Sequence, residues 1–165
     1  MRPLIAGATA ALLLVLTGCQ TPHTFATPDA SWQSSIGQLK HDNGERTVIG
    51  EVVIQRRGAQ EFQLDFLKGG SFPLLSLRQD ATTTRAEGVL ARGAWQGAAQ
   101  NAPRHLRHWV KLPGAFAAAD AGQRKWSADP TGDFAAEIQS TGKVINQLRI
   151  RALSPDEDFV FQFER

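Results

Sequence analysis

Alternation of apolar and polar side chains predicts an antiparallel meander in the first half of the chain. Within the stretch 61–79, Phe62, Leu64 and Phe66 alternate with polar residues. Because successive side chains of a strand point to opposite faces, this stretch should begin with a half-buried strand. A Gly-Gly pair then permits a reversal, and residues 74–79 are expected to return as a second strand.

The tip of this hairpin is expected to present an apolar side chain. Gly69 and Gly70 let the chain turn, and Pro73 is unsuited to a central strand. Phe72 should therefore stay out of the sheet pairing, and we predict that Phe72 and Leu74 form a membrane-inserting tip. An alternative of nearly equal weight is that Phe72 folds over the mouth of a barrel as a hydrophobic plug.

Similar patterns extend over the rest of the chain. Residues 32–39 fit either a short helix or an edge strand, and residues 101–113 have the apolar spacing of one amphipathic helix that ends at Pro-Gly. Further strands are expected at 46–57, 83–91, 124–128, 134–140, 143–152 and 158–164. Sheets of roughly eight strands tend to curl. The predicted fold is mainly β, a strongly curved antiparallel sheet that forms an incomplete, half-open barrel with a helix lid.

The amino terminus has the features of an export signal. Arg2 precedes an apolar run over 4–16, which is shorter than the ~20 residues of a membrane span. The run closes on Leu-Thr-Gly-Cys, which resembles the bacterial lipobox. This resemblance implies that residues 1–18 are a lipoprotein signal peptide and that Cys19 is acylated. The alternative is an ordinary secretory signal with a cysteine near its cleavage site.

Acylation also accounts for Cys19 being the only cysteine of an exported chain. Residues 19–31 contain little that could pack and are predicted to be an acylated tether, followed by a single domain over 32–165. Several acyl chains on one residue suffice for lasting membrane attachment. Gln20 is not the aspartate that marks inner-membrane retention in enteric relatives of this export system. We therefore expect a lipid-anchored protein of the outer membrane that faces the periplasm.

Charge and motifs exclude several function classes. Without the signal peptide the chain carries 17 basic and 16 acidic side chains and no Lys/Arg block, so nucleic-acid binding is not indicated. Catalytic and phosphate-loop motifs are missing, and we predict neither an enzyme nor a cofactor. His105 and His108 are three residues apart, but they are better explained as partly exposed helix-surface histidines than as metal ligands. Residues 156–158 are expected to form a solvated acidic turn.

One segment resembles a known family. The order of a lipobox, a hairpin with an apolar tip at 68–74, and Pro-Arg-His-Leu-Arg-His-Trp-Val-Lys-Leu-Pro-Gly over 103–114 is similar to the LolA–LolB superfamily, in particular the outer-membrane lipoprotein receptor LolB. The resemblance implies a monomer that accepts the acyl chains of lipoproteins from a periplasmic LolA-like carrier and helps to insert lipoproteins into the outer membrane.

Apolar strand faces give a candidate acyl-binding cavity. A curved sheet covered by one short helix can leave space that suits acyl chains. The predicted cavity residues are Phe62, Leu64, Phe66, Leu106, Trp109, Leu148, Ile150 and Phe161. The alternative is that these side chains simply fill a core, in which case the protein is a non-catalytic scaffold lipoprotein of an envelope assembly.

Overall fold

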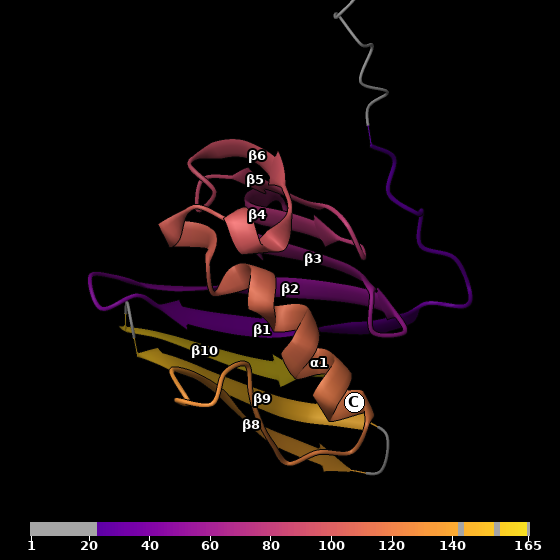
Figure 1. Ribbon diagram of the computed structural model, residues 1–165, viewed down its shortest axis with the longest axis vertical. Helices are drawn as coiled ribbons and strands as arrows, with labels where there is room; N and C mark the ends of the chain where they lie inside the picture. Colours follow the sequence, from indigo (N-terminus) through magenta and orange to yellow (C-terminus); the bar gives the residue numbers. More distant parts are fainter. Residues whose placement is uncertain (1–22, 142–143, 154–155, 165) are drawn as a thin grey trace, which may run out of the picture.

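The computed structural model describes residues 23–141, 144–153 and 156–164, and within these ranges ten strands form a single antiparallel sheet (Figure 1). Its order is β6-β5-β4-β3-β2-β1-β10-β9-β8-β7. The strands are β1 Gln33–Asp42, β2 Thr47–Arg57, β3 Glu61–Lys68, β4 Phe72–Gln79, β5 Thr84–Gly88, β6 Gly93–Gly97, β7 Lys125–Ser127, β8 Phe134–Thr141, β9 Val144–Leu153 and β10 Asp156–Phe163. The sheet does not close, so the prediction of a mainly β, curved and incomplete barrel is confirmed.

Strand β1 lies in the middle of the sheet, where the two halves of the chain meet. Leu39 of β1 is opposite Gly50 of β2 on one side and Phe161 of β10 on the other. Of the two readings left open for residues 32–39, a strand is therefore correct, but it is central rather than at an edge. This pairing makes the first and last strands neighbours, so the whole sheet belongs to one folding unit.

The segment after β4 contains a strand that the sequence pattern did not indicate. In place of one strand over 83–91, the chain forms β5, a turn over 89–92, and β6. Gly88 and Gly93 bracket the turn, each with a φ of 116°, a conformation suited to glycine. Strand β6 is short and begins and ends with glycine, so it has no apolar alternation by which to be identified.

The β3–β4 hairpin differs in detail from the expectation. Phe72 is opposite Lys68 and Pro73 is opposite Leu67, so the tip residue is part of the strand ladder and the prediction that it stays unpaired is wrong. A register shift between Phe66 and Leu67 accommodates the proline. This irregularity lies where Pro73 cannot donate a backbone hydrogen bond.

Gly50 of β2 lies where the neighbouring strand β3 comes very close. A Cβ atom at this position would lie 2.1 Å from the carbonyl oxygen of Leu67 and 2.9 Å from the ring of Phe66. Only glycine allows β2 and β3 to approach this closely.

The segment that crosses the concave face of the sheet is residues 99–120, called here the covering segment (Figure 1). It consists of the 3-10 turns η1 Ala99–Asn101, η2 Arg104–Leu106 and η3 Trp109–Lys111, and the helix α1 Leu112–Asp120. The predicted helix over 101–113 is therefore wrong. Proline inside that helix would remove a hydrogen bond, whereas proline in the first turn is favourable, so α1 begins where the pattern suggested an end.

A glycine follows the carboxyl end of helix α1. Gly122 has a φ of 76°, and its N–H donates to the carbonyl of Ala119 at 2.9 Å. The N–H of Gln123 donates to the carbonyl of Ala118 at 3.0 Å. Bonds of this type satisfy carbonyls that a helix end would leave without partners.

The strand directions define two ends of the sheet. The chain reverses direction at each turn, so every second turn of the meander falls at the same end of the sheet. The turns 43–46, 69–71 and 89–92 therefore lie at one end, called here the tip end. The turns 58–60 and 80–83 lie at the other end, called here the tether end.

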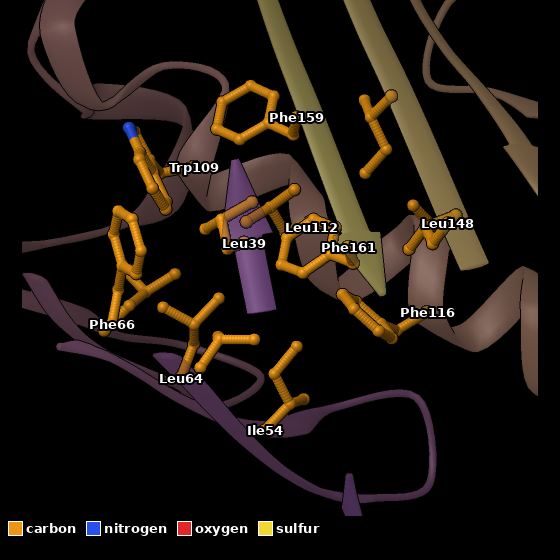
Figure 2. Packing of buried hydrophobic residues seen from close by; sticks show 14 of the residues in the cluster. Leu39, Ile54, Leu64, Phe66, Trp109, Leu112, Phe116, Leu148, Phe159 and Phe161 are labelled. Atoms are coloured by element: carbon orange, nitrogen blue, oxygen red, sulfur yellow. The ribbon is translucent and has the colours of Figure 1, made fainter. Parts of the chain in front are cut away.

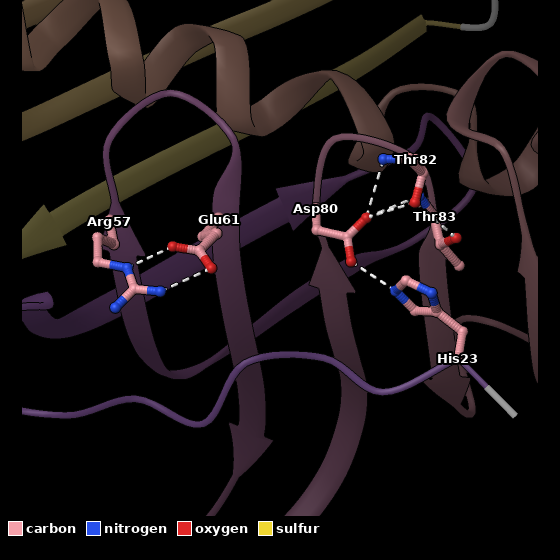
Figure 3. A network of polar contacts seen from close by, with 6 residues as sticks. All are labelled: His23, Arg57, Glu61, Asp80, Thr82 and Thr83. Atoms are coloured by element: carbon pink, nitrogen blue, oxygen red, sulfur yellow. Dashed lines mark hydrogen bonds and ion pairs between the residues drawn. The ribbon is translucent and has the colours of Figure 1, made fainter.

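The described part of the tether, residues 23–31, is bound at the tether end (Figure 3). His23 Nε2 donates to Asp80 Oδ2 at 2.5 Å, and Asp80 Oδ1 accepts the N–H groups of Thr82 and Thr83 at 2.9 Å each. Phe25 is half-buried. The tether thus packs more than its composition predicted, since one turn carboxylate holds it against the sheet.

Candidate functional site

The eight side chains predicted to line a cavity all lie in one core between the sheet and the covering segment. Each is at most 3% exposed. Figure 2 shows the strand residues facing those of the covering segment. They are Phe62, Leu64, Phe66, Leu106, Trp109, Leu148, Ile150 and Phe161. Sequence reasoning therefore identified the right face of the sheet.

Aromatic rings occupy the centre of this core. The Trp109 ring lies 4.9 Å from that of Phe159 and 6.2 Å from that of Phe66, between ring centroids. The Phe116 ring lies 5.4 Å from that of Phe161, edge to face. Such contacts are typical of packed aromatic clusters. A pocket beside Phe62 holds about 10 Å³, roughly the space of one water molecule. In this conformation the predicted cavity residues pack against one another instead of surrounding an acyl-sized space.

Several core residues were missed as members of the site. Phe116 belongs to α1 and was missed because the predicted helix stopped at Pro113-Gly114, whereas Leu112 lay inside the predicted helix but was not named as a cavity residue. Leu39 was missed because β1 was not identified as a strand. The signal that finds Phe116 is its position three residues after a proline that can begin a helix.

The carboxyl end of the covering segment is fastened to the sheet by one ion pair. Arg56 of β2 donates from Nε and Nη2 to the two carboxylate oxygens of Asp120, at 2.7 and 2.8 Å, and from Nη1 to Ser35 Oγ at 3.0 Å. The guanidinium also lies 5.6 Å from the centre of the Phe116 ring. A buried arginine is tolerated only with such partners.

The amino-terminal half of the covering segment is held by two histidines. His105 Nε2 donates to the carbonyl of Ala91 at 3.0 Å, and His108 Nδ1 donates to Glu157 Oε2 at 2.9 Å. His108 and Glu157 are both buried, so the expectations of an exposed His108 and of a solvated acidic turn at 156–158 are wrong. The backbone of β10 begins at Asp156 and turns Glu157 inward, where the histidine compensates its charge.

A second buried histidine lies beside this pair. His41 of β1 stacks against Trp109 and Phe159, with ring centroids 4.9 and 4.8 Å apart, and its Nε2 is 4.0 Å from Glu157 Oε2. That nitrogen has no hydrogen-bond partner in the described chain. Burial lowers the pKa of His41 below its usual 6.5, and the charge of Glu157 partly opposes this shift. No group of His, Cys, Asp and Glu in the described ranges is arranged to hold a metal ion.

The two residues predicted for the hairpin tip have different environments. Phe72 is 55% exposed, which excludes the buried-plug alternative for this ring. Leu74 is only 6% exposed and belongs to the core, so its assignment to the tip is wrong. Val89, in the neighbouring turn, is 51% exposed and was not considered. It is brought close because the N–H of Leu90 donates to the carbonyl of Leu74 at 2.9 Å.

The predicted anchor, Cys19, lies outside the described residues. Where the structure does describe the chain, it contains no helix with the length and apolarity needed to cross a membrane.

Comparison with known proteins adds no functional assignment. No protein-family model matches the chain, and no curated protein matches it.

Proposed function

We propose that this protein is an outer-membrane-anchored, LolB-type lipoprotein receptor that binds acyl chains between the sheet and the covering segment. The observation that carries the proposal is that the apolar residues of one concave sheet face form a single buried cluster with those of residues 99–120. An acyl chain needs apolar surface and no specific polar partner. The resemblance of residues 103–114 to the receptor family points in the same direction.

Entry of an acyl chain requires the covering segment to move, because the core is closed. Polar contacts that oppose that movement include Arg56–Asp120 at the carboxyl end of the segment, and His105 with the Ala91 carbonyl and His108–Glu157 in its amino-terminal half. Arg56–Asp120 holds the carboxyl end of the segment, whereas His105 and His108 hold its amino-terminal half beside the apolar packing of Trp109. Exchange of Phe116 and Trp109 contacts for acyl contacts would keep apolar surface buried, so opening need not expose the core to water.

The exposed aromatic tip is the proposed contact with the membrane. Phe72 is at the tip end, whereas the tether is bound at the opposite end of the sheet. Strand β3 has eight residues and spans roughly 23 Å between these ends. Three residues lie between Cys19 and His23, so the four Cα-to-Cα steps that join them reach about 14 Å at most. With the tether bound, the tip would point away from the membrane that holds Cys19. Release of His23 would lengthen the free tether and let the domain rotate until the tip faces that membrane.

A second candidate function is a scaffold lipoprotein of an envelope assembly with a filled core. The observation in its favour is that the eight core residues are each at most 3% exposed and belong to one packed hydrophobic cluster. The two functions differ in whether the core can exchange its own contacts for those of a ligand.

Titration of a soluble form that begins at residue 23 with a fluorescent fatty acid tests the proposal. This form contains every described strand and the whole described core. We expect saturable binding that an acylated peptide displaces and that is accompanied by a change in tryptophan fluorescence. Absence of saturable binding at micromolar probe contradicts the receptor and favours the scaffold.

A further inference from the structure

A polar pocket lies at the tip end of the sheet, beside the exposed tip. It holds about 380 Å³ and is bounded by the β1–β2 turn on one side and by the β5–β6 turn and η2 on the other. Its lining residues are Asn43, Glu45, Arg92, Arg104, His105 and Glu157. The β5–β6 turn also carries Val89, so the pocket and the apolar tip share one structural element.

Two arginines of this pocket lack partners. In the described ranges, no ion pair or side-chain hydrogen bond involves the guanidinium of Arg92 or of Arg104. Arg56, Arg57 and Arg149, by contrast, are engaged by carboxylates and have fewer donors to offer a ligand. Two free guanidinium groups facing one pocket form a site for an oxyanion, since their N–H donors match phosphate oxygens.

The backbone at Arg92 supports a functional role. Its φ is 57°, and no other residue except glycine has a positive φ in the part of the chain that the structure describes. Glycine would adopt this conformation without strain. Arginine is therefore placed here at a cost to the fold, and such costs concentrate at binding sites.

The other charged residues of the pocket determine its affinity for an anion. Glu157 is already engaged by His108 Nδ1 at 2.9 Å. His105 donates from Nε2 to the Ala91 carbonyl, which leaves Nδ1 for a ligand. Glu45 is exposed and is the one pocket carboxylate without a side-chain partner in the described chain, so it opposes an anion. Binding should therefore be weak and sensitive to salt.

We propose that this pocket binds the phosphate group of a phospholipid headgroup while Phe72 and Val89 enter the apolar layer beneath it. The inference deepens the proposed function, because it names what the tip end contacts. It can fail separately, because phosphate binding does not require an acyl chain in the core.

The first test is an NMR titration of the soluble form from residue 23 with inorganic phosphate. We expect saturable shifts at the pocket backbone, and about a tenfold weaker affinity in Arg92→Gly or Arg104→Gln, each of which removes charged hydrogen bonds. Glu45→Gln should strengthen binding. Arg124→Gln, an exposed arginine beside β7, is the matched control and should change nothing. Arg92→Gly should also raise the melting temperature, so its loss of binding does not reflect unfolding.

The second test distinguishes a lipid from free phosphate. Flotation with phosphatidylglycerol vesicles should decrease several-fold in the Arg92→Gly/Arg104→Gln variant and in Phe72→Ala. Free phosphate at roughly 10 mM should reduce the flotation of the wild type by more than chloride of equal ionic strength, which only screens charge. Absence of saturable phosphate shifts overturns the site. Phosphate shifts with vesicle flotation unchanged by the double variant overturn its assignment to a lipid headgroup.

Discussion

Arg56 and Asp120 join the centre of the sheet to the end of the covering segment by two parallel hydrogen bonds of 2.7 and 2.8 Å. The Arg56 side chain is 7% exposed and that of Asp120 is 27% exposed. Since α1 carries Phe116 into the core, this pair fixes the position of the ring that faces Phe161. The strength of the Arg56–Asp120 ion pair therefore affects both the stability of the fold and the movement of the covering segment away from the sheet.

Asp120→Asn should lower the free energy of unfolding by about 2–3 kcal/mol. This is below the ~3–5 kcal/mol typical of a fully buried pair, because Asp120 is partly hydrated. The loss follows from leaving the Arg56 charge buried without its counterion. Urea denaturation measures it. The Arg57–Glu61 pair, exposed and also bidentate, provides the matched control, and Glu61→Gln should leave the free energy of unfolding nearly unchanged because solvent screens an exposed pair.

The same Asp120→Asn variant should take up a fluorescent fatty acid faster than the wild type if the covering segment is the gate. Stopped-flow mixing gives the rate. Equal rates in Asp120→Asn and wild type would mean that acyl chains, if bound, enter elsewhere.

Phe116→Ala should destabilise the protein by about 3–5 kcal/mol, because it removes a fully buried ring from the core (Figure 2). If acyl chains replace core contacts, the space left by the ring should also raise the affinity for a fatty-acid probe. Thermal melts with and without the probe measure both effects. A destabilised variant with no gain in affinity would favour the scaffold.

Phe72→Ala should change stability by less than about 0.5 kcal/mol, because the ring is more than half exposed. Its vesicle association should fall. Leu74→Ala is the matched comparison two residues away and should cost about 2–5 kcal/mol, because that side chain is buried. A pair of melting curves and a flotation assay measure these effects. The membrane-tip hypothesis is contradicted if Phe72→Ala floats like the wild type.

His23→Ala should release the tether without disturbing the turn at Asp80, whose bonds to Thr82 and Thr83 remain. We expect faster proteolysis within residues 24–31 and a loss of stability below about 1 kcal/mol, since the contact is partly exposed. On the anchored full chain, a fluorophore at the tip should move closer to the membrane. Unchanged proteolysis would show that His23 does not hold the tether.

Stability should fall as the pH decreases below about 6.5. Because the pKa of His41 is lower in the folded state than its usual 6.5, the unfolded state binds the proton more readily. The contribution is complete above pH 6.5 and is lost as the pH falls through the lowered folded pKa. His41→Phe keeps the stack between Trp109 and Phe159 and removes the titrating group, so its melting temperature should depend less on pH between 7 and 5, a window of roughly two units around the ordinary value. Parallel slopes for the two proteins would assign the acid sensitivity to another group.

The sequence determined the strand faces but not their partners. Alternation at Phe62, Leu64 and Phe66 identified the buried side of β3, because the period of two is a local property of an extended chain. The same alternation identified Phe161 in β10. Which strands are neighbours is a long-range property, and β1 could be recognised as central only once β2 and β10 were seen on its two sides.

The conformation of the covering segment depends on tertiary structure. Residues 101–113 have helical apolar spacing, yet they form 3-10 turns, because Leu106 and Trp109 must reach the curved sheet and Pro113 is better placed at a helix start. His108 and Glu157, 49 residues apart, carried no signal of a buried pair. Whether apolar side chains line a cavity or fill a core depends on the distance between the sheet and the covering segment. The sequence pattern is the same in the two cases, because it shows only which face of a strand is apolar.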